Sequence, residues 1–330
     1  MRFVLNSKIS HLQRILMTLN GSIVNWIVKR NRNHTMSLSA KIMRRVVTIG
    51  FPILFTKMYY YSNKQKGNPW GGKKSCLTLS WDCDLLEDIK AIPEILDSLA
   101  RYSVKCSFAC IGKWIERNPD IHKRLLREGH EIVNHTYTHP SNPVFCPDRR
   151  FNELSIEEQE EEIVNCHHTC EKVLNYKPIG FRAPHLIHTK YTDSILARIG
   201  YQYTSSRLAN KTLGYGKPLF VNNRLLEFPL SFYPGEPFSA FETWHFFRAP
   251  GVRVTDKTEN NFFKMFKLLI DIGIETNSYV NIYLDPIDVI KFNDFNRFLI
   301  YLTERKADLW IAKYEELTKF IKSRKFSFSG

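Results

Sequence analysis

Acidic side chains are missing from the first 74 residues of this 330-residue chain. The same segment carries 14 of the 47 Lys and Arg residues, which leaves 33 basic side chains to balance the 33 Asp and Glu of the remainder. The whole net charge of +14 therefore lies in residues 1–74. Such a block is either an unstructured basic arm or the binding segment for a partner that carries phosphate groups. Aromatic residues (Tyr59, Tyr60, Tyr61 and Trp70) suit a lipid interface, so we consider an anionic membrane surface and expect no specific nucleic acid.

Long apolar runs are also missing from this segment. Its apolar stretches at residues 23–28 and 46–56 are shorter than the roughly 18 to 20 residues that a membrane-spanning helix needs. No basic start is followed by an apolar stretch and a small-residue cleavage site, so the sequence predicts no secretory signal. We therefore expect a cytoplasmic protein that is peripheral at the inner face of the membrane where the basic segment binds lipid.

The cysteines do not form an even set. The chain has seven, at positions 76, 83, 106, 110, 146, 166 and 170. An odd number without a secretory signal favours free thiols in a reducing compartment over a framework of disulfides.

Short apolar strands alternate with amphipathic helices after a linker at residues 67–74 that is rich in Gly, Pro and Lys. The expected strands span residues 76–81, 105–111, 130–134, 179–181, 225–228, 278–284 and 308–312. The expected helices span residues 85–102, 119–128, 155–174, 191–199, 261–273, 294–304 and 314–321. Ser155 and Glu158 form a capping box at the start of one long helix. This alternation predicts parallel β-α units, and about seven or eight strands favour a barrel over a small open sheet.

Polar side chains follow four of the expected strands. They are Asp82 and Asp84 after the first strand, His135 and His139 after the third, Arg182 after the fourth and Asp285 after a late one. Because the carboxyl ends of the strands meet at one rim of a parallel barrel, these side chains should lie together. Catalytic groups of such barrels occupy the same rim.

The two histidines are spaced as metal ligands. Four residues separate His135 from His139, and on a helical turn this spacing would place both rings on one face. With one carboxylate they would form a His₂-carboxylate site that keeps positions open for water and substrate, as in catalytic zinc sites. Beside a cation, Asp82 and Asp84 would divide into a ligand and a base. The alternative is that Asp84 caps the following helix.

Arg182 offers a charge that does not titrate. A guanidinium can keep a nearby carboxylate ionised and oriented. The alternative for Arg182 is an ion pair elsewhere that serves only the fold.

Three short motifs resemble those of the NodB-homology polysaccharide deacetylases, carbohydrate esterase family four. They are LSWDCD at residues 79–84, HTYTH at 135–139 and RAP at 182–184, in the order and at the intervals of that family. The segment WIAKYEEL at residues 310–317 also resembles the last strand and helix of these enzymes. The resemblance covers residues 76–321, and the set is specific although each motif alone would be weak.

The resemblance implies a site and a fold. It implies that Asp84, His135 and His139 bind Zn²⁺ or a similar divalent ion such as Co²⁺. Asp82 would be the general base, Arg182 its orienting partner, and Thr136 would brace the loop that holds the histidines. The implied fold is a deformed (β/α) barrel of about seven parallel strands. The expected organisation is a basic extension and linker, a deacetylase domain and a C-terminal tail, at residues 1–75, 76–322 and 323–330.

The implied activity is hydrolysis of N-acetyl, or O-acetyl, groups on a sugar of a polysaccharide or glycan precursor. Two other readings stay open: a catalytically impaired homologue that keeps the metal and binds carbohydrate, and a hydrolase of non-sugar C–N amide bonds with the same fold. A basic adaptor that uses the barrel as a scaffold is a further alternative.

Two positions depart from the family pattern. Cys83 separates the paired acids and could itself be a soft metal ligand. Asp285 stands where the family usually places the histidine that acts as general acid, so the proton donor is open. Asp285 is itself a candidate, and the histidines that could replace the missing one are His185, His188 and His245.

We predict that residues 1–74 attach the chain to anionic lipid. Each basic residue close to a negatively charged membrane contributes ~1 kcal/mol, and added salt screens this attraction. The full chain should float with vesicles that contain an acidic phospholipid and should not float with neutral vesicles. Equal flotation with both kinds of vesicle, or none with either, contradicts the prediction.

Overall fold

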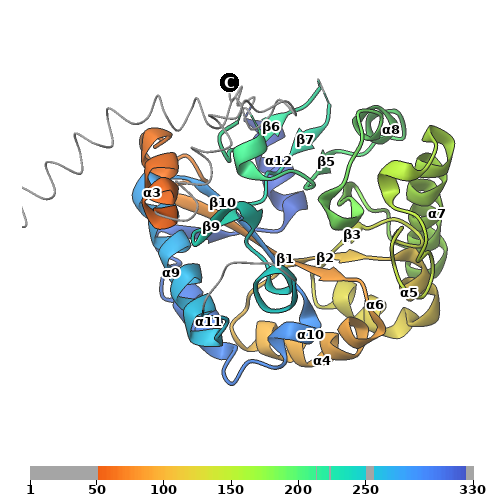
Figure 1. The fold of residues 1–330 in the computed structure, drawn as a ribbon, viewed down its shortest axis with the longest axis horizontal. Coiled ribbons are helices and arrows are strands. Elements are labelled where there is room, and N and C mark those ends of the chain that lie inside the picture. Colours follow the sequence, from red (N-terminus) through yellow and green to blue (C-terminus); the bar gives the residue numbers. More distant parts are fainter. Residues whose placement is uncertain (1–50, 213, 223, 250–255, 325–330) are drawn as a thin grey trace, which may run out of the picture.

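A curved sheet of mostly parallel strands forms the centre of the computed structural model, which describes residues 51–324 apart from 213, 223 and 250–255 (Figure 1). The sheet has nine strands in the order β10-β1-β2-β3-β4-β5-β7-β6, and β11 pairs with β1. They are β1 (Ser75–Cys83), β2 (Ser107–Cys110), β3 (Glu131–Asn134), β4 (Gly180–Phe181), β5 (Tyr203–Thr204), β6 (Leu219–Phe220), β7 (Leu226–Glu227), β10 (Tyr279–Leu284) and β11 (Leu309–Ile311). Only the pairing of β6 with β7 is antiparallel among them. The predicted α/β class is confirmed, and the described strands form a half-barrel.

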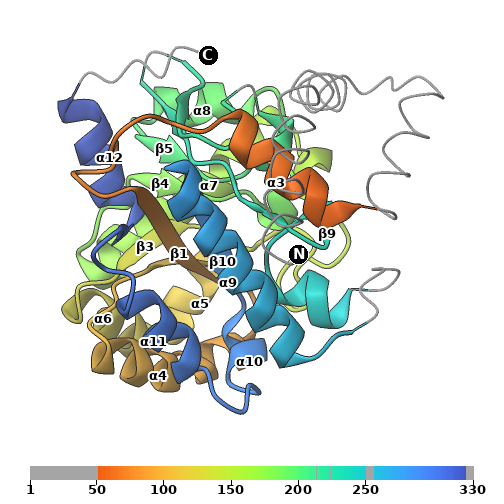
Figure 2. The same ribbon diagram turned by 90° about the vertical axis from the view of Figure 1, so that its left-hand side faces the viewer.

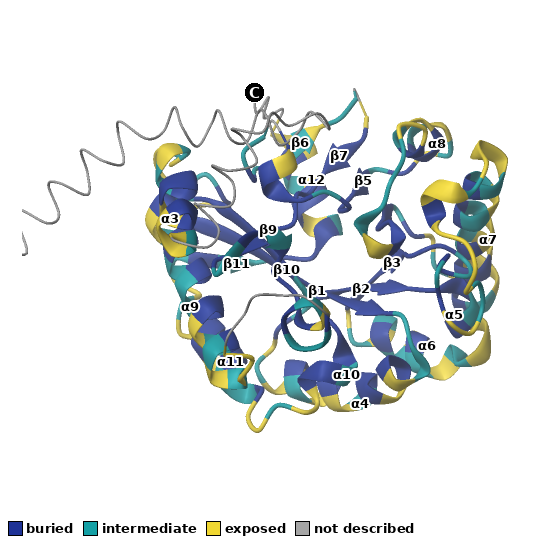
Figure 3. Cartoon of the chain, viewed as in Figure 1, coloured by how far each residue is buried: buried dark blue, intermediate teal, exposed yellow. Residues whose placement is uncertain are grey.

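Helices surround the sheet, as Figure 1 shows. They are α3 (Pro52–Ser62), α4 (Leu86–Arg101), α5 (Gly112–Arg117), α6 (Pro119–Arg127), α7 (Ile156–Leu174), α8 (Thr192–Arg198), α9 (Glu259–Thr276), α10 (Pro286–Val289), α11 (Asn296–Thr303) and α12 (Tyr314–Ser323). Figure 3 shows buried strands in the middle and exposed residues on the outer faces of the helices. No helix of this described part is long and apolar enough to cross a bilayer.

The central strand β1 is buried along its whole length. Leu77 and Leu79 of β1 lie beside Val280 and Ile282 of β10 in the parallel register. A continuous apolar run is what a strand covered on both faces requires, because neither face meets water. This burial explains why the strand could be recognised from its sequence.

The capping box predicted for α7 is confirmed. The Glu158 N–H donates to Ser155 Oγ at 3.2 Å, and the Ser155 N–H donates to Glu158 Oε2 at 2.7 Å. The two reciprocal bonds satisfy backbone donors that a helix start leaves open. The helix ends where Asn175 adopts a left-handed conformation, with φ of 51°.

Several of the shortest elements were not predicted, although β4 and β7 were. β5 and β6 have two residues each, and the hairpin of β8 (Phe232–Tyr233) and β9 (Glu236–Ala240) was also missed. Two residues are too few to show a period. β4 depends on a neighbour instead, because a Cβ on Gly180 would lie 1.8 Å from Cζ of Tyr203 in β5. Only glycine lets these two strands pair.

The described part of the basic segment packs against the domain. Figure 2 shows α3 beside α9 and β9, and Phe55, Tyr59 and Tyr60 of α3 are buried. The Tyr59 hydroxyl donates to the Ala209 carbonyl at 3.0 Å, and the indole N–H of Trp70 donates to a backbone carbonyl at 2.9 Å. Tyr59, Tyr60 and Trp70 are therefore not available to lipid, so the support they lent to the membrane prediction is lost. Residues 1–50, which carry much of the charge, lie outside the described residues, as do 325–330 of the tail.

Replacement of Tyr59 by alanine should destabilise the whole domain. Tyr59 has no solvent exposure, and truncating a large buried aromatic side chain costs about 3–5 kcal/mol. Leu54→Ala is the matched control, because Leu54 lies on the same helix and is 44% exposed. Denaturant unfolding of the full chain measures both. Equal stability of the two variants would mean that α3 is not part of the folded unit.

Candidate active site

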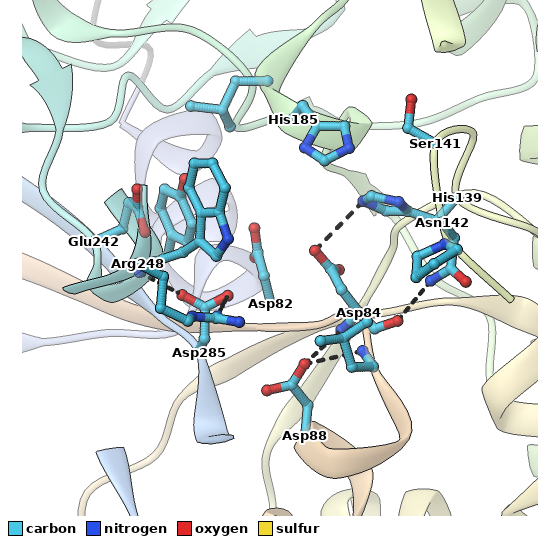
Figure 4. Close-up of a pocket in the computed structure, with 15 residues that line it drawn as sticks. Asp82, Asp84, Asp88, His139, Ser141, Asn142, His185, Glu242, Arg248 and Asp285 are labelled. Carbon is cyan, nitrogen blue, oxygen red and sulfur yellow. Dashed lines mark hydrogen bonds and ion pairs between the residues drawn. The ribbon is translucent and has the colours of Figure 1, made fainter. Parts of the chain in front are cut away.

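The parallel register brings the predicted residues to one rim. Cys83 pairs with Cys110, Cys110 with Asn134 and Asn134 with Phe181 across four neighbouring strands. The residues that follow these positions therefore leave the sheet at one level. Asp82 and Asp84 of the β1 end, His139 and Asp285 line one cavity (Figure 4).

Asp84, His135 and His139 form a cluster that could hold a metal ion. One ligand atom from each lies within 4.8 Å of the others. Nε2 of His135 is 3.2 Å from Asp84 Oδ1, and Nε2 of His139 is 3.5 Å from Asp84 Oδ2. Burial by itself raises the pKa of Asp84, but His139 and His135 lower it below its ordinary value. Burial lowers the pKa of His139 to about 3, so its neutral ring offers lone pairs.

The cluster leaves buried polar atoms without partners. Asp84 Oδ1, His135 Nε2 and both ring nitrogens of His139 have no hydrogen bond within the described residues. Buried polar atoms normally find partners, because leaving them unpaired costs free energy. His135 Nδ1 lies 2.8 Å from the Arg182 carbonyl, a contact that leaves Nε2 as the free lone pair. A divalent cation fits this donor set.

The loop that carries the histidines is not the helical turn that the spacing suggested. Thr136 and His139 have positive φ values of 67° and 54°, which non-glycine residues adopt at a cost. The Thr136 hydroxyl accepts the His139 N–H at 3.0 Å, as the predicted brace requires. Glu162 of α7, which sequence reasoning missed, accepts the N–H groups of Tyr137 and Thr138 at 3.0 and 2.8 Å. These bonds hold the strained loop so that both rings face one point.

Asp84 does not cap the following helix. Asp88 does so instead, because its Oδ2 accepts the Leu85 N–H at 2.9 Å. The Asp84 carbonyl accepts the side-chain N–H groups of Trp114 and Asn142 at 3.0 and 2.7 Å. The carboxylate of Asp84 is thereby left to face the histidines.

Arg182 holds Asp82. The guanidinium is fully buried, and its Nη1 donates to Asp82 Oδ1 at 2.5 Å. Nη2 donates to the hydroxyls of Tyr314 at 2.6 Å and Ser80 at 3.0 Å, and Nε donates to the Ser205 carbonyl at 3.1 Å. Burial raises the pKa of Asp82, against the opposing effect of Arg182. The predicted pairing of Arg182 with Asp82 is present, and Tyr314 and Ser205 are partners that no sequence motif indicated.

Asp285 lines the cavity on the side opposite the histidines. Its Oδ2 accepts the Thr243 hydroxyl at 2.8 Å and the Trp244 N–H at 3.1 Å, and its Oδ1 lies 3.6 Å from Nη2 of Arg248. Burial raises the pKa of Asp285 well above its usual value, and the negative charge of Glu242 adds to the effect. The hydrogen-bond and ion-pair partners of Asp285 among the described residues do not include a histidine.

The other candidate residues, three histidines and Cys83, differ in whether they reach the cavity. His185 lines the cavity with its ring centroid 4.9 Å from that of His139, whereas His188 and His245 do not line it. Cys83 is not a ligand, since it belongs to the hydrophobic core and lies outside the metal cluster. Successive strand residues point to opposite faces, so Cys83 turns away where Asp82 turns in. All seven cysteines are free, as predicted.

Sequence reasoning missed one wall of the cavity. Glu242, Trp244 and Arg248 come from a connection that ends in a π-helical turn, Trp244–Arg248. This stretch shows neither helical nor strand periodicity, so no local pattern marked it. Trp244 is 45% exposed at the cavity.

Comparisons with known proteins find sequences similar to part of this chain. Residues 71–204 match the family model described as polysaccharide deacetylase. A peptidoglycan-N-acetylglucosamine deacetylase of Bacillus cereus is 36% identical over 98 residues, which are 30% of this chain and 32% of that protein. A chitooligosaccharide deacetylase of a Bradyrhizobium strain is 42% identical over 48 residues, 14% of this chain and 22% of that protein. The chain thus spans a third or less of the length of these curated relatives.

The fold has known counterparts as well. A Mycobacterium smegmatis structure described as that of a polysaccharide deacetylase aligns with a TM-score of 0.64 at 17% identity, over 80% of this chain and 96% of that one. At this identity the likeness concerns the fold alone. Residues 71–204 therefore resemble polysaccharide deacetylases in sequence, and the described part of the chain has the fold of a structure described in that way.

We predict one divalent ion per chain at Asp84, His135 and His139. Loss of a residue that only supports a ligand costs about 10–100-fold in metal affinity, so His139→Ala should cost at least that much. Asp82→Asn should keep the metal, because a base need not be a ligand. The control is His168→Ala, whose side chain is 69% exposed on α7. Metal analysis of the purified chains measures all three, and full metal content in His139→Ala would contradict the assignment.

Proposed function

We propose that this protein is a metal-dependent deacetylase that hydrolyses the N-acetyl group of a sugar in a polysaccharide or glycan precursor. The observation that carries the proposal is the cluster of unpartnered ligand atoms on Asp84, His135 and His139 beside the oriented carboxylate of Asp82. A cation site next to a positioned carboxylate is what hydrolysis of an amide by activated water requires. Removal of O-acetyl groups from sugars is the closely related alternative.

In the proposed reaction, the metal would activate water and substrate, and side chains of the protein would transfer the proton. A bound Zn²⁺ or Co²⁺ ion would lower the pKa of a coordinated water and polarise the acetyl carbonyl. Asp82 would take a proton from the attacking water, and its bond from Arg182 would fix its position for this role. Enclosure of Arg182 makes this orientation rigid, because the guanidinium has four fixed partners.

The lining of the cavity and the names of the curated relatives support the proposed substrate class. The two curated relatives are named for peptidoglycan N-acetylglucosamine and for chitooligosaccharide, and both substrates carry an acetamide on a sugar. The cavity combines the polar cluster with apolar side chains from Leu186 and the exposed Trp244. Apolar and aromatic linings with a few polar groups are typical of sites for small organic ligands.

We also propose a place of action. The positive charge of residues 1–74 would hold the protein at an anionic lipid surface on the cytoplasmic side. An acetylated glycan precursor attached to that surface would then lie near the cavity.

A catalytically impaired homologue is the second candidate. The observation that favours it is Asp285, which stands where the family usually has a histidine, and which is held by Thr243, Trp244 and Arg248. Such a protein would bind metal and sugar without turnover, so metal content alone does not separate the two candidates.

Acetate release from N-acetylglucosamine oligomers in the presence of Zn²⁺ or Co²⁺ tests the proposed function. We expect turnover by the full chain and a loss of about 10²–10⁴-fold in Asp82→Asn, the usual contribution of a positioned base. Asp97→Asn is the control, because its side chain is 65% exposed outside the cavity. A metal-loaded chain that binds the oligomers and releases no acetate would support the impaired homologue.

A further inference from the structure

Glu242 is a buried carboxyl group that the chemistry above does not use. It lies between β9 and the π-helical turn Trp244–Arg248, is 4% exposed and lines the same cavity as Asp82. Figure 4 shows Glu242 and Asp285 on one side of the cavity and Asp84 and His139 on the other. A group at Glu242 would thus meet a substrate from the side opposite the cation site.

The two carboxyl oxygens of Glu242 differ in their hydrogen bonds. Oε1 accepts the His245 N–H at 2.7 Å. Oε2 is buried and has no hydrogen-bond partner within the described residues. If Glu242 were ionised, the negative charge on Oε2 would have no hydrogen-bond donor in a buried position, which is unfavourable. If Glu242 were a carboxylic acid, Oε2 would carry a proton that can be donated.

Asp285 is the opposite case. Two donors, Thr243 and Trp244, already bond its Oδ2, and Arg248 lies 3.6 Å from its Oδ1. These contacts favour its ionised form, although burial raises its pKa. When two neighbouring carboxyl groups compete for one proton, the group with fewer donors keeps it. Of this pair, Glu242 is the one whose hydrogen bonds leave an oxygen free to carry the proton.

The charges around Glu242 act in the same direction. Burial raises the pKa of Glu242 to about 8, and the negative charges of Asp82 and Asp288 add to this effect. Tyr283 and Asp285 of the β10 end also face it, and both have a raised pKa. The nearby cation, Arg248, pairs with Asp285 and Asp288. Burial and the surrounding charges therefore favour the acid form of Glu242.

We propose that Glu242 is the general acid that donates a proton to the leaving nitrogen, in place of the histidine that this chain lacks. The role rests on the proposed deacetylase function. Asp82 takes one proton from the attacking water while the oxygen of that water bonds to the acetyl carbon. The carbon–nitrogen bond then breaks with its electron pair on nitrogen, and the Glu242 proton moves to that nitrogen. The products are the sugar amine and acetic acid, and exchange with solvent returns Asp82 and Glu242 to their starting states.

The variant Glu242→Gln tests this role, because glutamine keeps the shape of the side chain and the bond from the His245 N–H. We expect it to release acetate from N-acetylglucosamine oligomers about 100-fold more slowly than the parent. It should hydrolyse 4-nitrophenyl acetate within about threefold of the parent rate, since that leaving group needs no proton. The parent should lose amide turnover as pH rises through the Glu242 pKa, because the acid form is required, and the variant should lack this loss.

Glu236→Gln is the matched control, since Glu236 lies on the preceding strand, pairs with His245 at 3.5 Å and does not line the cavity. Infrared titration of protonated carboxyl groups supplies a readout that does not depend on activity. We expect a carboxylic acid signal at neutral pH that Glu242→Gln lacks and Glu236→Gln keeps. Parent-like amide turnover in Glu242→Gln would overturn the role of Glu242 and leave the deacetylase function intact. A parent that never releases acetate would overturn both.

Discussion

The charge of Arg182 is enclosed at the centre of the half-barrel, and the arrangement of the site depends on how that charge is satisfied. A buried, unpaired guanidinium would cost several kcal/mol. Its partners, Asp82, Ser80, Ser205 and Tyr314, come from β1, from the residue after β5 and from the start of α12. Segments far apart in the sequence must therefore be in place together. The position of Asp82 is a consequence of the fold itself.

The cavity has two walls of different origin. The strand ends form the first wall, where backbone pairing fixes Asp82, Asp84 and the histidine loop. The connection after the β8–β9 hairpin and the residue after β10 form the second. Among the described residues that line this wall, Glu242 and Asp285 are accompanied by one guanidinium, that of Arg248, which pairs with Asp285 and Asp288. Such an excess is stable only when some carboxyl groups keep their protons. The first wall carries the candidate cation ligands, and the second carries Glu242, the carboxyl group that we propose as the proton donor.

Local pattern predicted the regular parts of this fold well. The capping box of α7 was readable because both partners lie within one turn. The spacing of the histidines correctly predicted that both rings lie together, but it suggested a helical turn. The structure has a strained loop instead, with positive φ at Thr136 and His139, and Glu162 holds this loop. The helix start is capped by Asp88, which the sequence analysis did not consider, and not by Asp84. The bonds from Glu162 come from a distant segment, whereas the Asp88 bond lies within the helix start itself.

The sequence by itself determined the order of strands and helices and the placement of Asp82, Asp84, His135 and His139 at one rim. Periodicity marks the longer elements, and parallel strands end at a common edge whatever surrounds them. Only the tertiary structure decided what each side chain does at that rim. Tyr314 reaches Arg182 across 132 residues, and Thr243 reaches Asp285 across 42. The free oxygen of Glu242 likewise results from packing, because no short-range pattern records which donors a distant segment leaves unused.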